Sequence, residues 1–458
     1  MVDKKNPASC EPIMDLSKCA LNFPKNFMWG TSTSSHQVEG HNQLNDWWAW
    51  EQKGKVLNRQ ISGDACNHYY LYKKDFEMMK NMHHNTHRIS IEWSRIEPKE
   101  GEFNKEELKH YRKVVQELIN QGIRPMVTLH HFTLPYWFAQ AGGFLNPKAR
   151  DIFNRFVRRV IEEIGDLVEY WVTINEPFVY AQKGYMDGSW PPGEKSFFKL
   201  VKVLRVLFYM HLDTYKTIKE IYNKNHWGSS MVGFVCHLIW FDQSEKHSLM
   251  DKILVNFYRY FFNKSYYRAF YSGRLPLILG YNKVPEAKKS LDFVGINYYF
   301  RCTCRFSLFN GFIISHEEAG RERTLSNWEV YPEGLYNLCK LMYRKLKKPI
   351  IITENGISTL DDNQRVSYII RHLEAINRAM REGVDIKGYL YWSFMDNFEW
   401  AEGYTQPFGL VGINYRTFER IPKSSAQVFS EICKTGRVTD NMIKHHAKSI
   451  RERLLRET

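Results

Sequence analysis

Eight short apolar runs, each separated from the next by a loop and a stretch of helical periodicity, constrain the fold of this chain most strongly. The runs are rich in β-branched residues and apolar along most of their length, which is typical of parallel strands buried on both faces. Strands that alternate with helices predict a parallel sheet. The runs span residues 27–34, 86–93, 124–131, 169–176, 230–237, 291–298, 348–355 and 386–393.

Eight strand–helix units favour one closed barrel over an open sheet. An open, doubly wound sheet is the alternative, but no G-x-G-x-x-G sequence follows the first run. Length alone would divide 458 residues into about three domains, yet barrels of this kind run long as one domain. We therefore expect an α/β protein with a single (β/α)₈ (TIM) barrel over residues 23–437, an N-terminal extension (1–22) and a basic C-terminal tail (438–458).

Two helix starts can be predicted from capping residues. Asn146 followed by Pro147 is typical of a cap and a first helical position, and the apolar residues that follow are three and four apart. Asn104 with Glu107 three residues later resembles a capping box. The aromatic segment D-W-W-A-W (46–50) is expected to pack as a loop.

The formal net charge of +14 would by itself suggest an anionic partner. The cations are scattered, however, and cluster only at 442–456, where a solvated helical tail is favoured over an electrostatic anchor. No basic run is interleaved with aromatic residues, so no nucleic-acid partner is expected. The N-terminus has no apolar core of a signal sequence, and no run of about 18 apolar residues could span a bilayer, so we expect a cytoplasmic protein without a transmembrane segment.

The eight cysteines are dispersed, and only Cys302 and Cys304 are close in sequence. This spacing, without a second pair, is a poor signal for zinc. His83, His84 and His87 lack a carboxylate partner at helical spacing. We therefore expect reduced thiols, no metal site and no cofactor.

Polar side chains gather where the eight runs end, which in a barrel of this kind is one shared mouth. Among them, Glu176 ends the fourth run in T-I-N-E-P, and Glu354 ends the seventh in I-T-E-N-G. The whole set consists of Gln37, Glu39, Glu92, Trp93, Arg95, His130, His131, Asn175, Glu176, Asn297, Tyr299, Glu354, Asn355, Trp392, Asp396 and Glu399.

Paired carboxyls at one mouth suit the cleavage of a glycosidic bond, which needs a proton donor and a nucleophile or base. Carboxyls about 5 Å apart give retention of configuration, whereas about 6.5–9.5 Å leaves room for water and gives inversion. The sequence supplies the pair but not the distance. For either glutamate alone, an ion pair with Arg or Lys is an equally good interpretation.

Seven segments in order resemble glycoside hydrolase family 1, in the form of its β-glucosidase-like retaining β-glycosidases, between about residue 23 and about residue 432. They are F-M-W-G-T-S-T-S-S-H-Q-V-E-G (27–40), R-I-S-I-E-W-S-R-I-E-P (88–98), T-I-N-E-P (173–177), D-F-V-G-I-N-Y-Y (292–299), W-E-V-Y-P-E-G-L-Y (328–336), I-I-T-E-N-G (351–356) and Y-W-S-F-M-D-N-F-E-W-A-E-G-Y (391–404).

The resemblance implies that Glu176 is the general acid/base and Glu354 the nucleophile of a retaining enzyme, with Arg88 and Tyr299 orienting Glu354. It implies that Asn175 holds the substrate 2-hydroxyl and that Trp392 lies under the sugar ring. The remaining substrate contacts that it implies are Gln37, His131, Asn297, Tyr299, Glu399 and Trp400 for the sugar, Trp328 at the aglycone entrance and Phe408 on the sugar side.

Three features depart from the family's pattern. His36 stands where Tyr is common, Phe132 follows His131 where Trp is common, and the loop 301–320 has no recognisable pattern. These differences affect which aglycone is expected and leave the assignment of the two carboxylates unchanged.

Two alternatives to a β-glycosidase remain. A 6-phospho-β-glycosidase typically replaces the Glu-Trp pair found here at Glu399 and Trp400 with a serine, and an inactive sugar-binding barrel should have lost Glu176 or Glu354. The expected partner is a small-molecule β-glycoside. Glucose, galactose, fucose and mannose stay open as the sugar, as does the oligomeric state.

Overall fold

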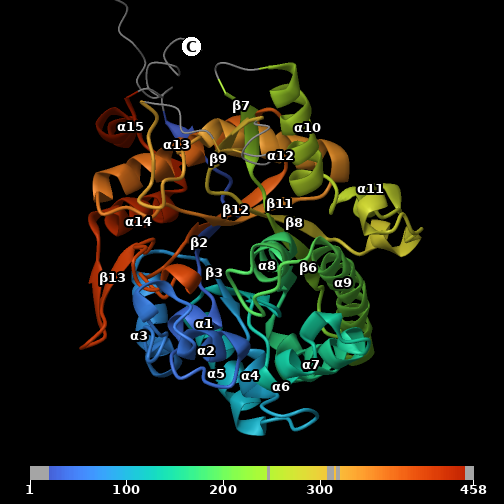
Figure 1. Ribbon diagram of the computed structural model, residues 1–458. Coiled ribbons are helices and arrows are strands. Elements are labelled where there is room, and N and C mark those ends of the chain that lie inside the picture. Colours follow the sequence, from blue (N-terminus) through green and yellow to red (C-terminus); the bar gives the residue numbers. More distant parts are fainter. Residues whose placement is uncertain (1–19, 245–247, 307–313, 316–319, 449–458) are drawn as a thin grey trace, which may run out of the picture.

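The structure, a computed structural model, describes residues 20–244, 248–306, 314–315 and 320–448. Eight parallel strands close into a barrel with helices around it (Figure 1). Each of the eight expected runs contains one barrel strand, so the predicted fold class is confirmed. The strands are β2 (Met28–Ser32), β3 (Thr86–Ser90), β4 (Arg124–Thr128), β5 (Tyr170–Asn175), β6 (Met231–His237), β8 (Phe293–Asn297), β11 (Ile350–Asn355) and β12 (Ile386–Trp392).

The interior of the barrel is filled by side chains that point inward from its strands, as in other barrels of this size. Strand β3 differs, because its Arg88 side chain, which is fully buried, carries a charge into the interior. The apolar residues of this inner cluster are Met28, Met126, Val172, Val235, Phe293, Ile351 and Leu390.

In the part of the chain that the structure describes, eleven α-helices cover the barrel or join its strands, in addition to α5, α7, α10 and α11 described below. Segment 46–50 belongs to α2, so the expectation of a loop was wrong; the Asn45 side chain accepts a hydrogen bond from the Trp48 amide and starts the helix. The bounds are α1 (Ser35–Val38), α2 (Asp46–Gln52), α3 (His68–Asn81), α4 (Trp93–Ile96), α6 (Tyr136–Gln140), α8 (Pro177–Gln182), α9 (Phe197–Asn225), α12 (Pro332–Leu346), α13 (Asp362–Arg381), α14 (Ser424–Thr435) and α15 (Asp440–His446).

The two predicted helix starts differ in outcome. Helix α5 (Lys105–Asn120) begins as expected, with the Asn104 side chain accepting bonds from two backbone amides. Helix α7 (Ala149–Ile164) begins later than expected, because Asn146 accepts a bond from the Lys148 amide in a turn that precedes the helix. Pro147 therefore lies in that turn and not at the first helical position.

After β6, and again after β8, the chain leaves the barrel, and these two excursions together build a side sheet that the sequence did not predict. Its strands are ordered β10 (Ile314–Ser315), β9 (Arg301–Arg305) and β7 (Trp240–Gln243). Helices α10 (Leu249–Asn263) and α11 (Arg268–Ser272) belong to the first excursion, between β7 and β8. Cys302 and Cys304 lie on β9 with their sulfurs 3.9 Å apart.

The two ends of the described chain meet. Strand β1 (Leu21–Asn22) pairs antiparallel with β15 (Arg437–Val438), while β13 (Val411–Asn414) and β14 (Glu419–Pro422) form a separate hairpin. Most of the expected N-terminal extension, residues 1–19, and residues 449–458 of the basic tail lie outside the described residues.

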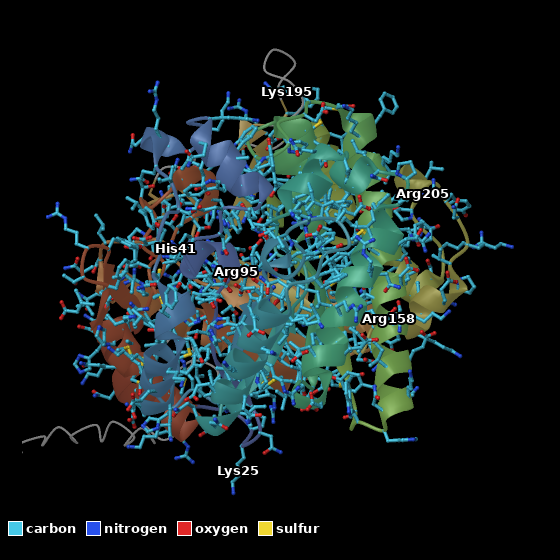
Figure 2. All side chains as sticks on the ribbon, turned by 90° about the horizontal axis from the view of Figure 1, so that it is seen from below. Lys25, His41, Arg95, Arg158, Lys195 and Arg205 are labelled. Atoms are coloured by element: carbon cyan, nitrogen blue, oxygen red, sulfur yellow. The ribbon has the colours of Figure 1, made fainter. Side chains whose placement is uncertain are left out.

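The cations are spread over the molecule, as the sequence indicates. Lys25, Arg158, Lys195 and Arg205 extend in different directions (Figure 2), whereas Arg95 is largely buried against Glu39. None of the helices in the described part of the chain combines the length and apolarity needed to cross a bilayer.

Candidate active site

The carboxyl ends of the barrel strands surround a cavity of about 500 Å³. Glu176 directly follows β5, Glu354 lies near the end of β11, and Trp392 ends β12, so side chains distant in sequence meet at one mouth. The expected site residues that line this cavity are His131, Glu176, Tyr299, Trp328, Glu354, Trp392, Glu399, Trp400 and Phe408.

Glu354 is held by two donors. Arg88 Nη1 lies 2.5 Å from Glu354 Oε1, and the Tyr299 hydroxyl donates to Oε2 over 2.6 Å. Gly356 explains the glycine of I-T-E-N-G, because a Cβ there would lie 1.8 Å from the Trp392 carbonyl oxygen. The carboxylate is thus fixed in orientation by a charge-assisted pair and a phenol.

Glu176 lies at a backbone position that favours glycine, with φ of +44°. Its amide donates to the Val235 carbonyl oxygen over 2.9 Å, which ties it to β6. Asn297 Nδ2 donates to Glu176 Oε1 over 2.6 Å. The carboxyl is therefore held by fewer donors than that of Glu354.

A chain of amides joins the two carboxyls. Asn297 Nδ2 lies 3.2 Å from Asn175 Oδ1, which also accepts from Arg88 Nη2 over 2.7 Å. Thr353 donates to Asn297 Oδ1 over 2.7 Å and so fixes which way this amide points. Asn175, Asn297 and Arg88 are fully buried beneath the cavity surface.

The surroundings distinguish the two carboxyls electrically. Burial and the neighbouring charge of Glu354 raise the pKa of Glu176 well above its usual range. Burial also raises the pKa of Glu354, but Arg88, Tyr299 and Asn297 oppose that rise. A proton shared between the two therefore resides on Glu176, which leaves Glu354 ionised.

Glu399 and two aromatic rings form one side of the cavity. Gln37 Nε2 donates to Glu399 Oε2 over 3.2 Å, and burial together with the charge of Glu354 raises the pKa of Glu399 to about 8. Gln37 itself is fully buried behind Glu399. The His131 ring stacks near Trp392 and Trp400, with centroids 6.0 and 6.1 Å away.

His36, one of the departures from the family's pattern, supports Trp400 from behind. Its ring stacks on Trp400 with centroids 5.9 Å apart, and its Nε2 lies 2.8 Å from Glu51 Oε1. Burial opposes protonation, but the Glu51 carboxylate outweighs it and raises the pKa of His36. Trp47 packs on Trp400 as well, with centroids 4.8 Å apart.

A second aromatic cluster, which shares Trp392, also lines the cavity. Tyr299, Trp392 and Phe408 form one cluster with the partly buried rings of Phe300 and Trp328. The Trp328 ring lies 4.9 Å from Phe300 and 6.1 Å from Phe408, measured between centroids. Flat apolar rings of this kind suit one face of a sugar or an apolar aglycone.

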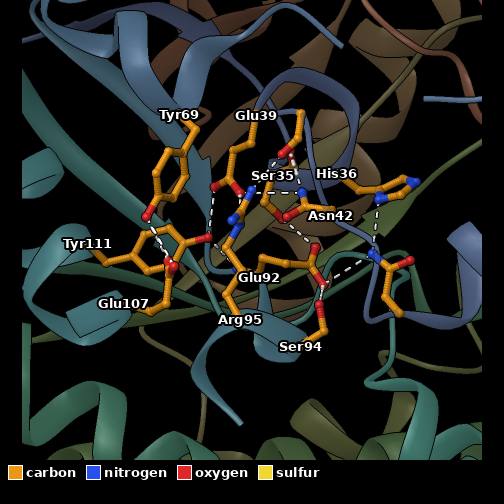
Figure 3. Close-up of polar contacts among 12 residues, drawn as sticks. Ser35, His36, Glu39, Asn42, Tyr69, Glu92, Ser94, Arg95, Glu107 and Tyr111 are labelled. Atoms are coloured by element: carbon orange, nitrogen blue, oxygen red, sulfur yellow. Dashed lines mark hydrogen bonds and ion pairs between the residues drawn. The ribbon is translucent and has the colours of Figure 1, made fainter. Parts of the chain in front are cut away.

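Several polar residues at the strand ends face away from the cavity. Glu39, Glu92 and Arg95 belong to one largely buried polar network with Ser35 and Tyr111 (Figure 3). Arg95 Nε lies 2.9 Å from Glu39 Oε2, and the Tyr111 hydroxyl donates to Glu39 Oε1 over 2.7 Å. Ser35 donates to Glu92, so the network fixes the helix that carries Gln37.

Three further strand-end residues are also structural. The His130 ring packs between Phe144 and Tyr180. Asn355 bonds to the Tyr298 carbonyl oxygen over 2.6 Å. Asp396 forms an ion pair with Lys423.

His237 lines the cavity and was missed at the sequence level. It ends β6, and its Nδ1 lies 3.7 Å from Glu176 Oε1. Burial lowers the pKa of His237 to about 4, so the ring is neutral beside the carboxyl. Its position as the last residue of the fifth apolar run could have indicated that it belongs to the site.

Among the described residues, no group of three or more His, Cys, Asp or Glu side chains is arranged to hold a metal ion.

Known proteins resemble this chain in sequence and in fold. The model of glycosyl hydrolase family 1 matches residues 20–438. Beta-glucosidase A of Thermotoga maritima is 32% identical over 449 residues, covering 91% of this chain and 99% of that protein. The structure of a beta-glycosidase from Pyrococcus horikoshii is similar with a TM-score of 0.85 and 39% identity, covering 93% of this chain and 98% of that one. A Thermotoga maritima beta-glucosidase in complex with castanospermine has a TM-score of 0.84 and 31% identity, covering 91% and 99%.

Proposed function

Because this chain belongs to glycosyl hydrolase family 1 and is a β-glycosidase of the β-glucosidase type, we propose that it works by double displacement with Glu354 as nucleophile and Glu176 as acid/base. The observation that carries the proposal is the unequal environment of the two carboxyls. Arg88 and Tyr299 donate to Glu354, whereas the pKa of Glu176 is raised well above its usual range.

In the first step, a Glu354 oxygen attacks the anomeric carbon while the bond from that carbon to the leaving oxygen breaks. Glu176 gives its proton to the leaving oxygen, and the aglycone departs as an alcohol. The sugar is left as an ester of Glu354 with inverted configuration.

In the second step, Glu176 is ionised and takes a proton from water, which attacks the same carbon. The ester bond to Glu354 breaks, and the second inversion gives a product with the original β-configuration. Loss of the negative charge of Glu354 in the ester lowers the pKa of Glu176, which suits its change from acid to base.

The sugar is proposed to lie over Trp392, with Glu399, Gln37, His131 and Trp400 binding its hydroxyl groups. Asn175 would bind the 2-hydroxyl, since its amide joins Arg88 and Asn297 between the two carboxyls. Trp328 and Phe300 would contact the aglycone, and Phe408 would close the sugar side.

A panel of nitrophenyl β-glycosides tests this function. We expect sustained release of nitrophenol, with β-glucoside among the substrates of highest kcat/KM. Galactoside, fucoside and mannoside in the same panel identify the preferred sugar. Absence of turnover with every member would contradict the proposed function and favour an inactive sugar-binding barrel.

Substrate charge gives a second expected result. A 6-phosphate would bring a dianion into a cavity in which Glu354 is ionised and Glu399, whose pKa is about 8, gains negative charge as the pH rises. Like charges brought together cost several kcal/mol, so kcat/KM should be about 100-fold or more lower for the 6-phosphorylated nitrophenyl β-glucoside. The measurement is a direct comparison of the two substrates; a higher value for the phosphorylated one would move the chain to the 6-phospho-β-glycosidases.

The pH profile should respond to Tyr299→Phe. The Tyr299 hydroxyl stabilises the ionised form of Glu354, so its removal raises the pKa of Glu354. Since Glu354 attacks as a carboxylate, the acidic limb of kcat/KM should move to higher pH. Loss of a hydrogen bond to a charged group should also lower kcat/KM by about 10- to 100-fold.

Tyr298→Phe is the matched control for this change. The Tyr298 hydroxyl donates to the Tyr331 carbonyl oxygen over 2.6 Å and not to a carboxyl, so the acidic limb should stay where it is. An unchanged limb in Tyr299→Phe, or equal shifts in both variants, would show that Tyr299 does not hold Glu354 ionised.

A further inference from the structure

Helix α10 exposes an apolar stripe. Leu249, Met250, Ile253, Phe257 and Tyr260 keep exposed fractions between 37% and 74%. Their spacing of about three and four residues places them on one face, opposite the buried Leu254, Val255 and Tyr258. A contiguous exposed apolar face on a helix is typical of an interaction surface, whereas single exposed apolar residues are common everywhere.

A basic groove adjoins this stripe. It lies between the C-terminal part of α10 and helix α12 and has a volume of about 530 Å³. Figure 1 shows α10 at the upper edge of the molecule with α12 below it. The charged residues that line the groove are Arg259, Lys264, Lys340, Arg344, Lys347 and Glu382.

Most of the positive charge in the groove is unbalanced. Lys340 pairs with Glu382 over 2.5 Å, and Arg259 lies 3.6 Å from Asp242. Within the described ranges, Lys264, Arg344 and Lys347 have no carboxylate partner. Burial and the cations Lys345, Arg259 and Arg344 lower the pKa of Lys264, so an anion in the groove would relieve mutual repulsion.

The cations also follow one edge of the stripe. Lys252 and Arg259 are seven residues apart on α10, which places them on one side of the helix. An apolar face with a cationic border fits a lipid surface whose headgroups are anionic. A second copy of the chain fits less well, because a twofold contact would bring the same unpaired cations together.

From this arrangement we propose that α10 and the groove beside it dock the protein on a membrane surface that carries anionic lipid headgroups. The apolar stripe enters the headgroup boundary, and Lys264, Arg344 and Lys347 lie among the phosphates. The stripe connects to the mouth of the barrel through aromatic rings. Phe257 stacks on Phe261 with centroids 5.7 Å apart, and Phe261 lies 5.1 Å from Phe178, two residues after Glu176.

Vesicle flotation tests the proposal with the full-length protein. Vesicles of phosphatidylcholine with an equal part of phosphatidylglycerol should bind it at least about 20-fold more strongly than phosphatidylcholine alone. Arg344→Gln with Lys347→Gln should weaken binding to the anionic vesicles about 25-fold, since each cation contributes about fivefold. Ile253→Ser with Phe257→Ser should weaken it about 10-fold or more.

Matched controls lie on other parts of the surface. Arg158→Gln with Lys195→Gln removes two exposed cations elsewhere, and Phe198→Ser removes an exposed ring from α9. These variants should bind vesicles as the wild type does. All variants should hydrolyse a soluble nitrophenyl glycoside at the wild-type rate, which shows that they are folded and keeps this test separate from the proposed mechanism.

Three outcomes would overturn the proposal. One is the absence of vesicle binding. Another is an equal loss of vesicle binding in the α10 variants and in the control variants. The third is a dimer, detected by light scattering, that Ile253→Ser with Phe257→Ser dissociates while vesicle binding is unchanged; the stripe would then be an interface between copies.

Discussion

Glu354→Ala is expected to lower kcat for a nitrophenyl β-glycoside by on the order of 10⁴-fold or more, because the attacking oxygen is gone. In the wild type, a 2-deoxy-2-fluoroglucoside with a good leaving group should form a stable ester. Peptide mass spectrometry should place that label on Glu354.

The fold should survive the change, although Arg88 loses its carboxylate partner in the interior. Glu354→Gln keeps an acceptor for the Tyr299 hydroxyl and serves as the second variant if the alanine form is unstable. Glu402→Ala is the matched control, since Glu402 also lines the cavity but lies at its edge. A label on any other residue, or near-normal activity in both Glu354 variants, would refute the assignment.

Glu176→Ala should affect substrates according to their leaving group. Formation of the ester from an alkyl glycoside should slow roughly 10²–10⁴-fold, because the departing oxygen needs a proton. A dinitrophenyl glycoside needs none, so its first step should change much less. Hydrolysis of the ester should slow for both, since no base is left to activate water.

Azide distinguishes the two glutamates. Azide needs no base, so in Glu176→Ala it should restore turnover and give the β-glycosyl azide. In Glu354→Ala, where azide replaces the nucleophile, the product should be the α-azide. Failure of azide to rescue Glu176→Ala, or an α-azide from it, would mean that Glu176 is not the acid/base of a retaining enzyme.

The barrel could be predicted because its strands are buried on both faces and so appear as continuous apolar runs. The side sheet could not, since β7 and β9 lie in a stretch without a regular apolar pattern, although β9 is as long as several barrel strands. The start of α7 was misplaced because an asparagine bonds equally well to the amides of a turn and of a helix.

The sequence predicted which strand ends carry polar residues, but not which of those side chains point into the cavity. Glu39 and Glu92 follow barrel strands, as Glu176 does, yet they belong to a polar network with Arg95 and Ser35 that does not line the cavity. His237 was overlooked because a single histidine at a strand end is as common in a core, as His130 is here. The direction of a side chain depends on which elements pack beside it, and a short sequence segment does not contain that information.

Because the backbone at Glu176 is left-handed, stability and catalysis favour different residues at this position. A non-glycine residue there costs about 1–2 kcal/mol, and glycine would adopt the same conformation without strain. A laboratory screen that rewards heat resistance alone would therefore drift toward glycine at this position and discard the acid/base carboxyl. Heat-resistant variants of this chain are best chosen by screens that score turnover in the same round.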